Sequence, residues 1–413
     1  MHHKFCNIGQ YPVSRRTLGC SALAALFLSG CSETLKRKTD LSTGVQSPQK
    51  VIFAGLSFTG NYADNQANCP LSFAAAQAAD LDGMLRKRIE NRTFKGFELL
   101  IDSQGMQSTD ADACAFTLAI DFETTTVSAL PDNRFKVILT VYASLLFFDF
   151  HEKKVINTVP VNCEYVTLEE KRPTKKRLEA LMRGLLTGEL PEIELSFIDA
   201  AVKKLENVNV RSSYGMRLKV RNIDFDDRGR ESFKVLKAKP QQICSLYAQL
   251  LTRSLVDRLG IAMLPYTKGQ AIGAKMSGRF IDGRAFQLEI PQGDYAVDIR
   301  LYGLKTLSEE NDDGKTIHQA FFVFMGLTFL QPDLNKVYFS QVMRGTGTAL
   351  LLKGQKPGLR ASYLETSAGL MDGFAKCIAD TDGDWIDDCI PPQKHDSFRS
   401  ELNALRPILE KME

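Results

Sequence analysis

Histidine, tryptophan and long apolar runs are all scarce in this sequence. It contains five histidines and one tryptophan in 413 residues, and no two cysteines have CxxC spacing. The histidines and cysteines form no cluster with the spacing of a zinc site, which argues against a zinc domain. No apolar run reaches the about 20 residues that a membrane-spanning helix needs. The composition, 44% hydrophobic and 24% charged, is typical of a globular chain.

Net charge is also small. The chain carries 52 Lys and Arg residues against 49 Asp and Glu residues, a formal charge of +3. Lys4, Arg15 and Arg16 account for the excess, and all three lie near the start. The remainder is formally neutral, so the sequence gives no electrostatic reason to expect nucleic-acid binding.

The first 31 residues have the pattern of an export signal. The basic start is followed by a short apolar run, Thr17 to Leu28, and then by Ser29, Gly30 and Cys31. A basic start, a short apolar core and small residues before a cleavage point are typical of secretory signal peptides. We therefore expect residues 1–30 to be removed on export.

The residues Leu28-Ser29-Gly30-Cys31 resemble the lipobox of bacterial lipoproteins. That resemblance implies that the Cys31 thiol is acylated with fatty acids such as palmitate, that the chain is cut before Cys31, and that the new amino group is acylated. Ser32 follows the cysteine where an aspartate would signal inner-membrane retention, so the resemblance implies the periplasmic face of the outer membrane. A soluble cleaved precursor is the alternative. Ser14 to Leu18 also resembles a twin-arginine signal, which leaves the export route open.

Six cysteines remain after residues 1–30 are removed and Cys31 is lipidated. They are Cys69, Cys114, Cys163, Cys244, Cys377 and Cys389. An even number in an exported chain favours at least one disulfide, and six cysteines allow 15 pairings. Buried thiols are the alternative.

The processed chain of 383 residues is long enough for two or three domains. Residues 31–49 are polar and are expected to form a flexible tether. The order strand, helix, short strand, three long strands, helix then occurs twice, in residues 50–205 and 216–379. We therefore expect an α+β fold with two similar domains, each an antiparallel or mixed sheet with helices on one face. Two unrelated domains that share this order by chance are the alternative.

Apolar residues at alternate positions identify the long strands. The pattern in the first half is clear at Phe116, Leu118, Ile120 and Phe122. The long strands are expected at 115–126, 135–149, 154–166, 294–304, 320–330 and 336–342. A glycine-rich stretch, Gly269 to Gly283, precedes the long strands of the second half. Its first part, Gly269 to Lys275, lacks the GK[ST] ending of a phosphate loop and is expected to be a mobile loop.

This element order, together with the lipobox, resembles the periplasmic α/β domains of three envelope families. They are the curli secretion lipoproteins, the amino-terminal domain of the TolB translocation protein and the penicillin-binding-protein activator lipoproteins. The resemblance covers about residues 50–380 as two copies. It implies an assembly, anchoring or activator role in the cell envelope.

The stretch from Asp380 to Asp388 is the strongest candidate for a metal site. It contains five aspartates, Asp380, Asp382, Asp384, Asp387 and Asp388. Alternating carboxylates around a glycine can direct several oxygens at one calcium ion. The stretch resembles thrombospondin type 3 repeats and, less closely, an EF-hand loop; Cys377 and Cys389 flank it and could clamp it. An acidic surface loop is the alternative.

Two further segments have competing interpretations. Gly55 to Gly60 follows a strand, but Thr59 stands where the nucleophile elbow of a serine hydrolase has glycine. Ser397 to Met412 places Phe398, Leu402, Leu405, Leu409 and Met412 on one helical face, for packing on its own domain or for docking a partner.

The sequence as a whole predicts a non-enzymatic, lipid-anchored scaffold or accessory subunit of an envelope assembly, secretion or transport machine, with protein partners and no cofactor apart from calcium. A periplasmic lipoprotein that binds a small ligand or glycan between its domains is the first alternative, and an enzyme is the second. An exposed apolar patch would favour the scaffold, whereas a cleft with clustered ionisable groups would favour an enzyme.

Overall fold

The structure is a computed structural model of the whole chain, and the residues that it describes belong to one compact unit, Pro48–Glu413. The described residues are 49–59, 66–101, 114–130, 132–190, 192–210, 216–266, 275–280, 285–312, 314–355, 358–380 and 383–412. The expected signal peptide, the lipidation site Cys31 and all of the expected tether except Gln49 lie outside these residues, as does Asp382. None of the described helices is both long enough and apolar enough to cross a membrane.

The first half begins with a strand and ends with two helices. Its elements are β1 (Lys50–Thr59), α2 (Pro70–Ala78), α3 (Leu81–Ile89), β2 (Glu98–Leu100), β3 (Cys114–Ala129), β4 (Phe135–Asp149), β5 (Val155–Glu169), α4 (Lys175–Thr187) and α5 (Phe197–Leu205). Local sequence explains several helix starts. Asp80, Thr174 and Ser196 each accept a backbone N–H as the N-cap residue of α3, α4 and α5, and Pro70 occupies the first turn of α2.

The second half has the same order with additions. Its elements are β6 (Leu218–Phe225), α6 (Asp227–Ser232), η3 (Phe233–Leu236), α7 (Pro240–Leu259), β7 (Met263–Leu264), β8 (Lys275–Phe280), β9 (Ala285–Glu289), β10 (Tyr295–Glu310), β11 (Thr316–Gln331), η4 (Pro332–Leu334), β12 (Lys336–Leu352), α8 (Leu359–Ala379), α9 (Gly383–Cys389), η5 (Pro392–Lys394), α10 (His395–Leu409) and η6 (Glu410–Met412). The long strands β10 and β12 extend to Glu310 and Leu352, beyond the expected ends at Leu304 and Val342.

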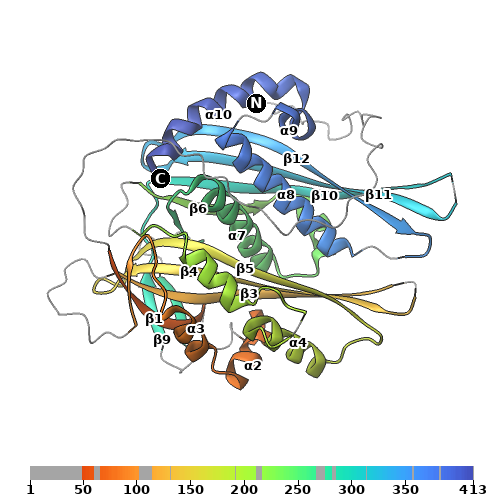
Figure 1. Cartoon of the computed structure of the whole chain (residues 1–413). Helices are drawn as coiled ribbons and strands as arrows, with labels where there is room; N and C mark the ends of the chain where they lie inside the picture. Colours follow the sequence, from red (N-terminus) through yellow and green to blue (C-terminus); the bar gives the residue numbers. More distant parts are fainter. Residues whose placement is uncertain are drawn as a thin grey trace. The chain divides into compact units, whose positions relative to one another are not determined.

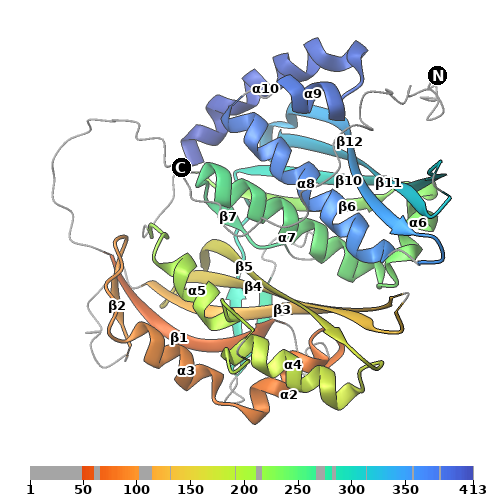
Figure 2. The ribbon, with the colours of Figure 1, turned by 45° about the vertical axis from the view of Figure 1, so that its right-hand side comes forward.

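The strands form two mixed sheets (Figures 1 and 2). The second sheet has the order β12-β11-β10-β6-β7. Five strands of the first sheet repeat this order as β5-β4-β3-β1-β2. In the first sheet, β1 is parallel to both of its neighbours, β2 and β3. In the second sheet, β6 is likewise parallel to β7 and β10. The long strands pair antiparallel in both sheets. The expected α+β fold with two similar halves is therefore confirmed.

Bulges recur at matching positions in the two sheets. β3 and β10 each contain 16 residues, and in both the eighth residue is a bulge, Asp121 in β3 and Tyr302 in β10. A second pair of matching bulges lies at Ala54 of β1 and Arg221 of β6. Ala54 faces the point between the third and fourth residues of β3, and Arg221 faces the same point of β10. Bulges are built into a strand at particular places, so their recurrence supports an internal duplication.

One hairpin of the second half joins the sheet of the first half. β8 pairs antiparallel with the end of β1, with Thr59 opposite Gly278, and β9 pairs with β8. Residues 269–274 of the expected mobile loop lie outside the described residues and Lys275 begins β8, so that expectation stays a prediction. The hairpin ties the two halves together, and the division into independent domains at residues 206–215 stays a prediction.

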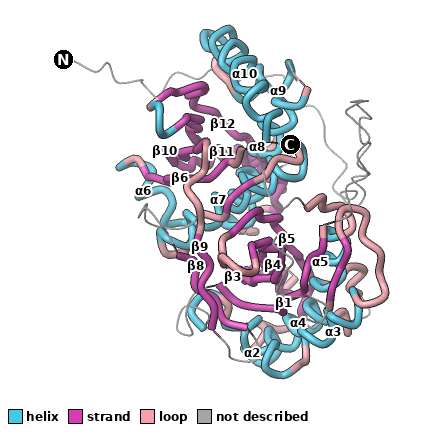
Figure 3. The backbone as a smooth tube through the Cα atoms, turned by 90° about the vertical axis from the view of Figure 1, so that its left-hand side faces the viewer, coloured by secondary structure: helices cyan, strands magenta, loops and turns pink. Residues whose placement is uncertain are grey.

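Helices separate and cover the sheets. Residues of α2, α3, α4 and α5 share a hydrophobic core with one face of the first sheet. Figure 3 shows α2, α3 and α4 on the side of that sheet opposite to α7. Residues of α7, α8 and α10 share a second core with β10, β11 and β12. Because this core also contains Phe122 and Tyr142 of the first sheet, the second half covers part of the remaining face of the first sheet.

The C-terminal helix completes the core of the second half. Its predicted apolar face is fully buried, with each residue at most 3% exposed; the residues are Phe398, Leu402, Leu405, Leu409 and Met412. The interpretation that this face packs on its own domain is confirmed. The alternative, that it docks a partner, is wrong because no side chain of the face is accessible.

Candidate functional site

The acidic stretch proposed as a calcium site is partly helical. Asp380 is the C-cap residue of α8, and α9 contains Asp384, Asp387 and Asp388. Asp382 lies outside the described residues. Across residues 114–130 and the other described ranges, no group of three or more His, Cys, Asp or Glu side chains could hold a metal ion. Calcium binding by this stretch therefore stays a prediction.

Two of these aspartates connect α9 to its neighbours. Oδ1 of Asp387 lies 3.4 Å from Nδ1 of His395 at the start of α10. The backbone carbonyl of Asp388 accepts a hydrogen bond from Nη2 of Arg344 in β12, at 2.9 Å. These contacts give α9 a structural role between α10 and the second sheet.

The six described cysteines are thiols in the structure, so the expected disulfide is not formed in it. Cys377 and Cys389 lie in or against the core of the second half. Burial raises the pKa of Cys114 and Cys163 to about 12 and the pKa of Cys69 well above its ordinary value. Because the thiolate is the nucleophilic form, these three thiols are chemically inert in the folded chain.

Ser57, the serine of the Gly55–Gly60 stretch, lies within β1. It is fully buried, and its hydroxyl shares a hydrogen bond with that of Thr117 at 2.8 Å. A nucleophile elbow would instead expose the serine on a turn between strand and helix. The geometry gives Ser57 a structural role between β1 and β3.

A buried polar group joins the first sheet to α7. The Asp121 carboxylate accepts hydrogen bonds from Oγ of Ser144, at 2.9 Å, and from Nε2 of Gln249 in α7. Burial raises the pKa of Asp121 to about 6, and hydrogen bonds to the carboxylate partly oppose this. Beyond the C-terminal end of α7, Oδ1 of Asn157 in β5 accepts the backbone N–H of Met263 in β7 at 3.1 Å.

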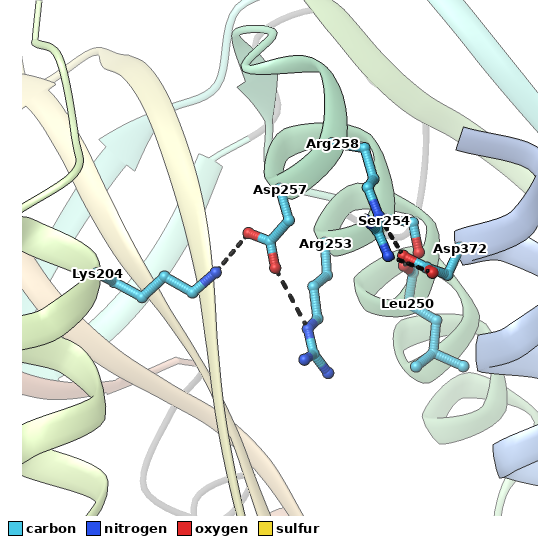
Figure 4. Close-up of polar contacts among 7 residues, drawn as sticks. All are labelled: Lys204, Leu250, Arg253, Ser254, Asp257, Arg258 and Asp372. Carbon is cyan, nitrogen blue, oxygen red and sulfur yellow. Dashed lines mark hydrogen bonds and ion pairs between the residues drawn. The ribbon is translucent and has the colours of Figure 1, made fainter. Parts of the chain in front are cut away.

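Ion pairs fix α7 on both sides (Figure 4). Asp257 of α7 pairs with Lys204 of α5 and lies 3.5 Å from Nε of Arg253. The next residue, Arg258, binds Asp372 of α8 with two hydrogen bonds of 2.9 and 2.7 Å. The helix α7 is thus held by the first half on one side and by α8 on the other.

A small hollow, partly open to solvent, lies between β3, α7 and the start of α8. Its lining includes Phe122 and Glu123 of β3, Gln242 and Leu246 of α7, and Arg360 of α8. The Glu123 carboxylate already accepts the backbone N–H groups of the first turn of α2 at 2.7 Å each. The one carboxylate in its lining is already occupied as a helix cap.

The outer face of the second sheet is a different kind of surface. In β11, the buried set faces α7 and α8, whereas the alternate set lies on the other side of the sheet. The buried set is Phe321, Val323, Met325, Leu327 and Phe329. The outer set is His318, Ala320, Phe322, Phe324, Gly326 and Thr328, which includes two half-buried aromatic rings.

Neighbouring strands extend this surface on both sides. We define the outer face as the outer set of β11 with its paired neighbours in β10 and β12. The paired neighbours are Asp298, Arg300, Gly303, Lys305, Leu307, Glu309, Ser340, Val342, Arg344, Thr346, Thr348 and Leu350; we add the bulge residue Tyr302 and Leu352, which pairs with Thr316 at the start of β11. Leu307, Val342, Leu350 and Leu352 are 41 to 57% exposed. A contiguous exposed apolar patch on a soluble protein marks an interaction surface.

Arginine side chains lie over the aromatic rings of the outer face. The Arg300 guanidinium is 5.6 Å from the ring centre of Tyr302, and the Arg344 guanidinium is 6.0 Å from that of Phe322. Such contacts hold the cations near the rings by cation–π attraction. The outer face therefore combines apolar area with positive charge.

The outer face was not predicted from the sequence. A signal exists in β11, where Phe321, Phe322 and Phe324 place large apolar residues on both sides of one strand. A middle strand that is apolar on both sides requires cover on both sides. In the described ranges, helices cover only one of them.

Comparisons with known proteins give little guidance. No family model and no curated protein matches the chain. Among solved structures, the crystal structure of a neuraminyllactose-binding hemagglutinin homolog from Helicobacter pylori aligns with 40% of this chain and 88% of its own, at 13% identity and a TM-score of 0.22. A likeness at this level supports no inference about the fold or function of this chain.

Proposed function

We propose that this chain is a lipid-anchored scaffold or accessory subunit of an envelope assembly, secretion or transport machine. In this proposal Cys31 carries the lipid, the folded unit faces the periplasm from the outer membrane, and the outer face binds a protein partner. The supporting observation is the outer face itself, with its aliphatic side chains exposed and aromatic rings beside them.

The chemistry of the described residues is consistent with a binding role. The buried thiols are held protonated, Ser57 is enclosed in a strand, and the Glu123 carboxylate caps a helix. Each of these groups has a structural explanation, so none of them argues for catalysis. The alternative, a small ligand or glycan held between the halves, is supported by the hollow beside Arg360.

Photo-crosslinking in cells tests the proposal. A photoreactive amino acid replaces Leu350, which is 57% exposed on the outer face, and in a matched variant it replaces Leu195, which is 43% exposed before α5. We expect Leu350 to form adducts with an envelope protein in the outer-membrane fraction, and Leu195 not to form them. Identical adducts from both positions, or none from Leu350, would contradict the proposed role of the outer face.

A further inference from the structure

The duplication relates the outer face to a face of the first sheet that is already covered. The bulge residues of β3 and β10 correspond, and the strand pairing beside each bulge sets the correspondence in β4 and β11. The corresponding residues are Asp121 and Tyr302, Tyr142 and Phe324, and Ser144 and Gly326. The two faces can therefore be compared position by position.

In the first sheet, a helix lies on this face. Asp121 and Ser144 both hydrogen-bond Gln249 of α7. Phe122, the residue after the bulge, lines the same hollow as Leu246 of α7, and Tyr142 stacks on Phe122 with ring centres 4.5 Å apart. The first sheet thus accepts a helix that the next part of the chain supplies.

In the second sheet, the corresponding positions are apolar: Tyr302 and Phe324 are half-buried and Gly326 is buried. The ring of Tyr302 lies over Gly326, where a Cβ atom would come within 3.0 Å of the ring. Phe324 stands where the first sheet has Tyr142, and Phe322 lies one pair further along. The polar contacts that hold α7 on the first sheet are replaced here by three aromatic rings.

The charges around these rings are mostly positive. Arg300 and Arg344 lie over two of the rings, and Lys305 is paired with Phe322 across the strands. Three acidic residues lie on this side of the sheet: Asp298 pairs with Arg221, Asp224 of β6 lies opposite Arg300 and accepts a hydrogen bond from Asn222, and Glu309 lies towards the hairpin tip. An occupant with acidic residues at its rim would complement this charge.

We propose that the outer face binds an acidic amphipathic α-helix of a partner protein, seated on the second sheet as α7 is seated on the first. This inference rests on the proposed scaffold function and specifies the partner element. The apolar side of the helix covers Tyr302, Phe322 and Phe324, and its acidic rim meets Arg300, Lys305 and Arg344. Helix-in-groove recognition of this kind uses anchors at i, i+3, i+4 and i+7.

A labelled peptide is the direct probe. We would use a helical peptide of Leu, Ala and Glu with the 20-residue length of α7, and a matched peptide with every Glu replaced by Lys. Fluorescence anisotropy with the full chain should show saturable binding of the acidic peptide, and about tenfold or weaker binding of the basic one. Equal affinity for both peptides, or no saturable binding, would overturn the inference.

Charge reversal locates the binding site. The double variant Arg300→Glu/Lys305→Glu should weaken binding of the acidic peptide about tenfold. The matched control Lys87→Glu/Lys176→Glu makes the same charge change on exposed residues of the first half and should leave binding unchanged. An equal loss in both variants would mean that net charge alone drives binding and would overturn the inference.

Mapping the natural contact separates this inference from the proposed function. A photoreactive residue at Thr346, beside Phe322 on the outer face, captures the partner in cells, and sequencing identifies the captured segment. An acidic amphipathic helical segment of another envelope protein supports both statements. Capture of a strand, a loop or a second copy of this chain overturns the helix inference only. Failure to capture any protein overturns the proposed function as well.

Discussion

Asp121 should make the stability of the protein depend on pH, and Asp121→Asn should remove this dependence. The Asp121 side chain is half-buried where the first sheet meets α7, and its carboxylate accepts hydrogen bonds from Ser144 and Gln249. Burial is the main cause that raises its pKa from the ordinary 3.8 to about 6. The charged form is therefore less stable in the folded protein than in the unfolded chain.

The sign of the effect follows from proton binding. Between pH 4 and pH 6 the folded state holds a proton on Asp121 that the unfolded state has lost, so stability from this group falls as the pH rises through that range. Below and above the range its contribution is constant. A difference of about 2 in pKa corresponds to roughly 3 kcal/mol. Because Asp121 keeps some solvent exposure, we expect a fall of roughly 2 kcal/mol.

The measurement is urea unfolding of the full chain and of the Asp121→Asn variant at pH values from 4 to 8. The pKa of Glu123 is also raised by burial, but Glu123 is present in both proteins and largely cancels in the difference. The free energy of unfolding of the natural protein minus that of the variant should fall by roughly 2 kcal/mol between pH 4 and pH 6. A control variant, Asp333→Asn in an exposed turn, should show a constant difference. A constant difference for Asp121→Asn as well would refute the reasoning.

Three further predictions concern the anchor, the core and the acidic stretch. Cys31→Ala should abolish acyl labelling and release the protein from the outer-membrane fraction. A variant that still carries the acyl label and stays in that fraction would contradict the lipobox assignment. Phe398→Ala should lower the free energy of unfolding by about 3 to 5 kcal/mol, because it leaves a cavity in the core. The control Arg399→Ala, at an exposed position, should change it by less than about 0.5 kcal/mol. Similar denaturation midpoints for the two variants would count against the packing described for α10. If the aspartates around Asp384 bind calcium, the melting temperature should be higher in calcium than in magnesium or chelator at matched ionic strength; equal melting in all three would dismiss the site.

The regular elements of the fold could be predicted because their signals are local. Alternation at Phe116, Leu118 and Ile120 identified β3, and helical spacing from Phe398 to Leu409 identified the buried side of α10. The ends of the strands were harder to predict. β10 continues to Glu310 through a polar segment at its exposed end, where neither side of the strand is buried and the alternation disappears.

The features that depend on distant parts of the chain could not be predicted. Glycine-rich sequence before and after β8 indicates a loop, and nothing local shows that residues 275–280 pair with β1. The helical segment at Asp384 is also decided by its contacts, since α9 packs against α8 and β12. The outer face was missed for the same reason. The apolar character of β11 is visible in the sequence, but which of its sides is covered depends on the positions of α7 and α8.

The β8–β9 hairpin also determines the order in which the chain can complete its fold. Gly278 pairs with Thr59 although it follows Thr59 by 219 residues. At about 5 to 20 residues per second, the ribosome adds this length in roughly 10 to 45 seconds. During that time the far end of β1 lacks its partner, and an unpaired strand edge invites incorrect pairing with other chains. The first half therefore reaches its final sheet only after most of the second half has been synthesised.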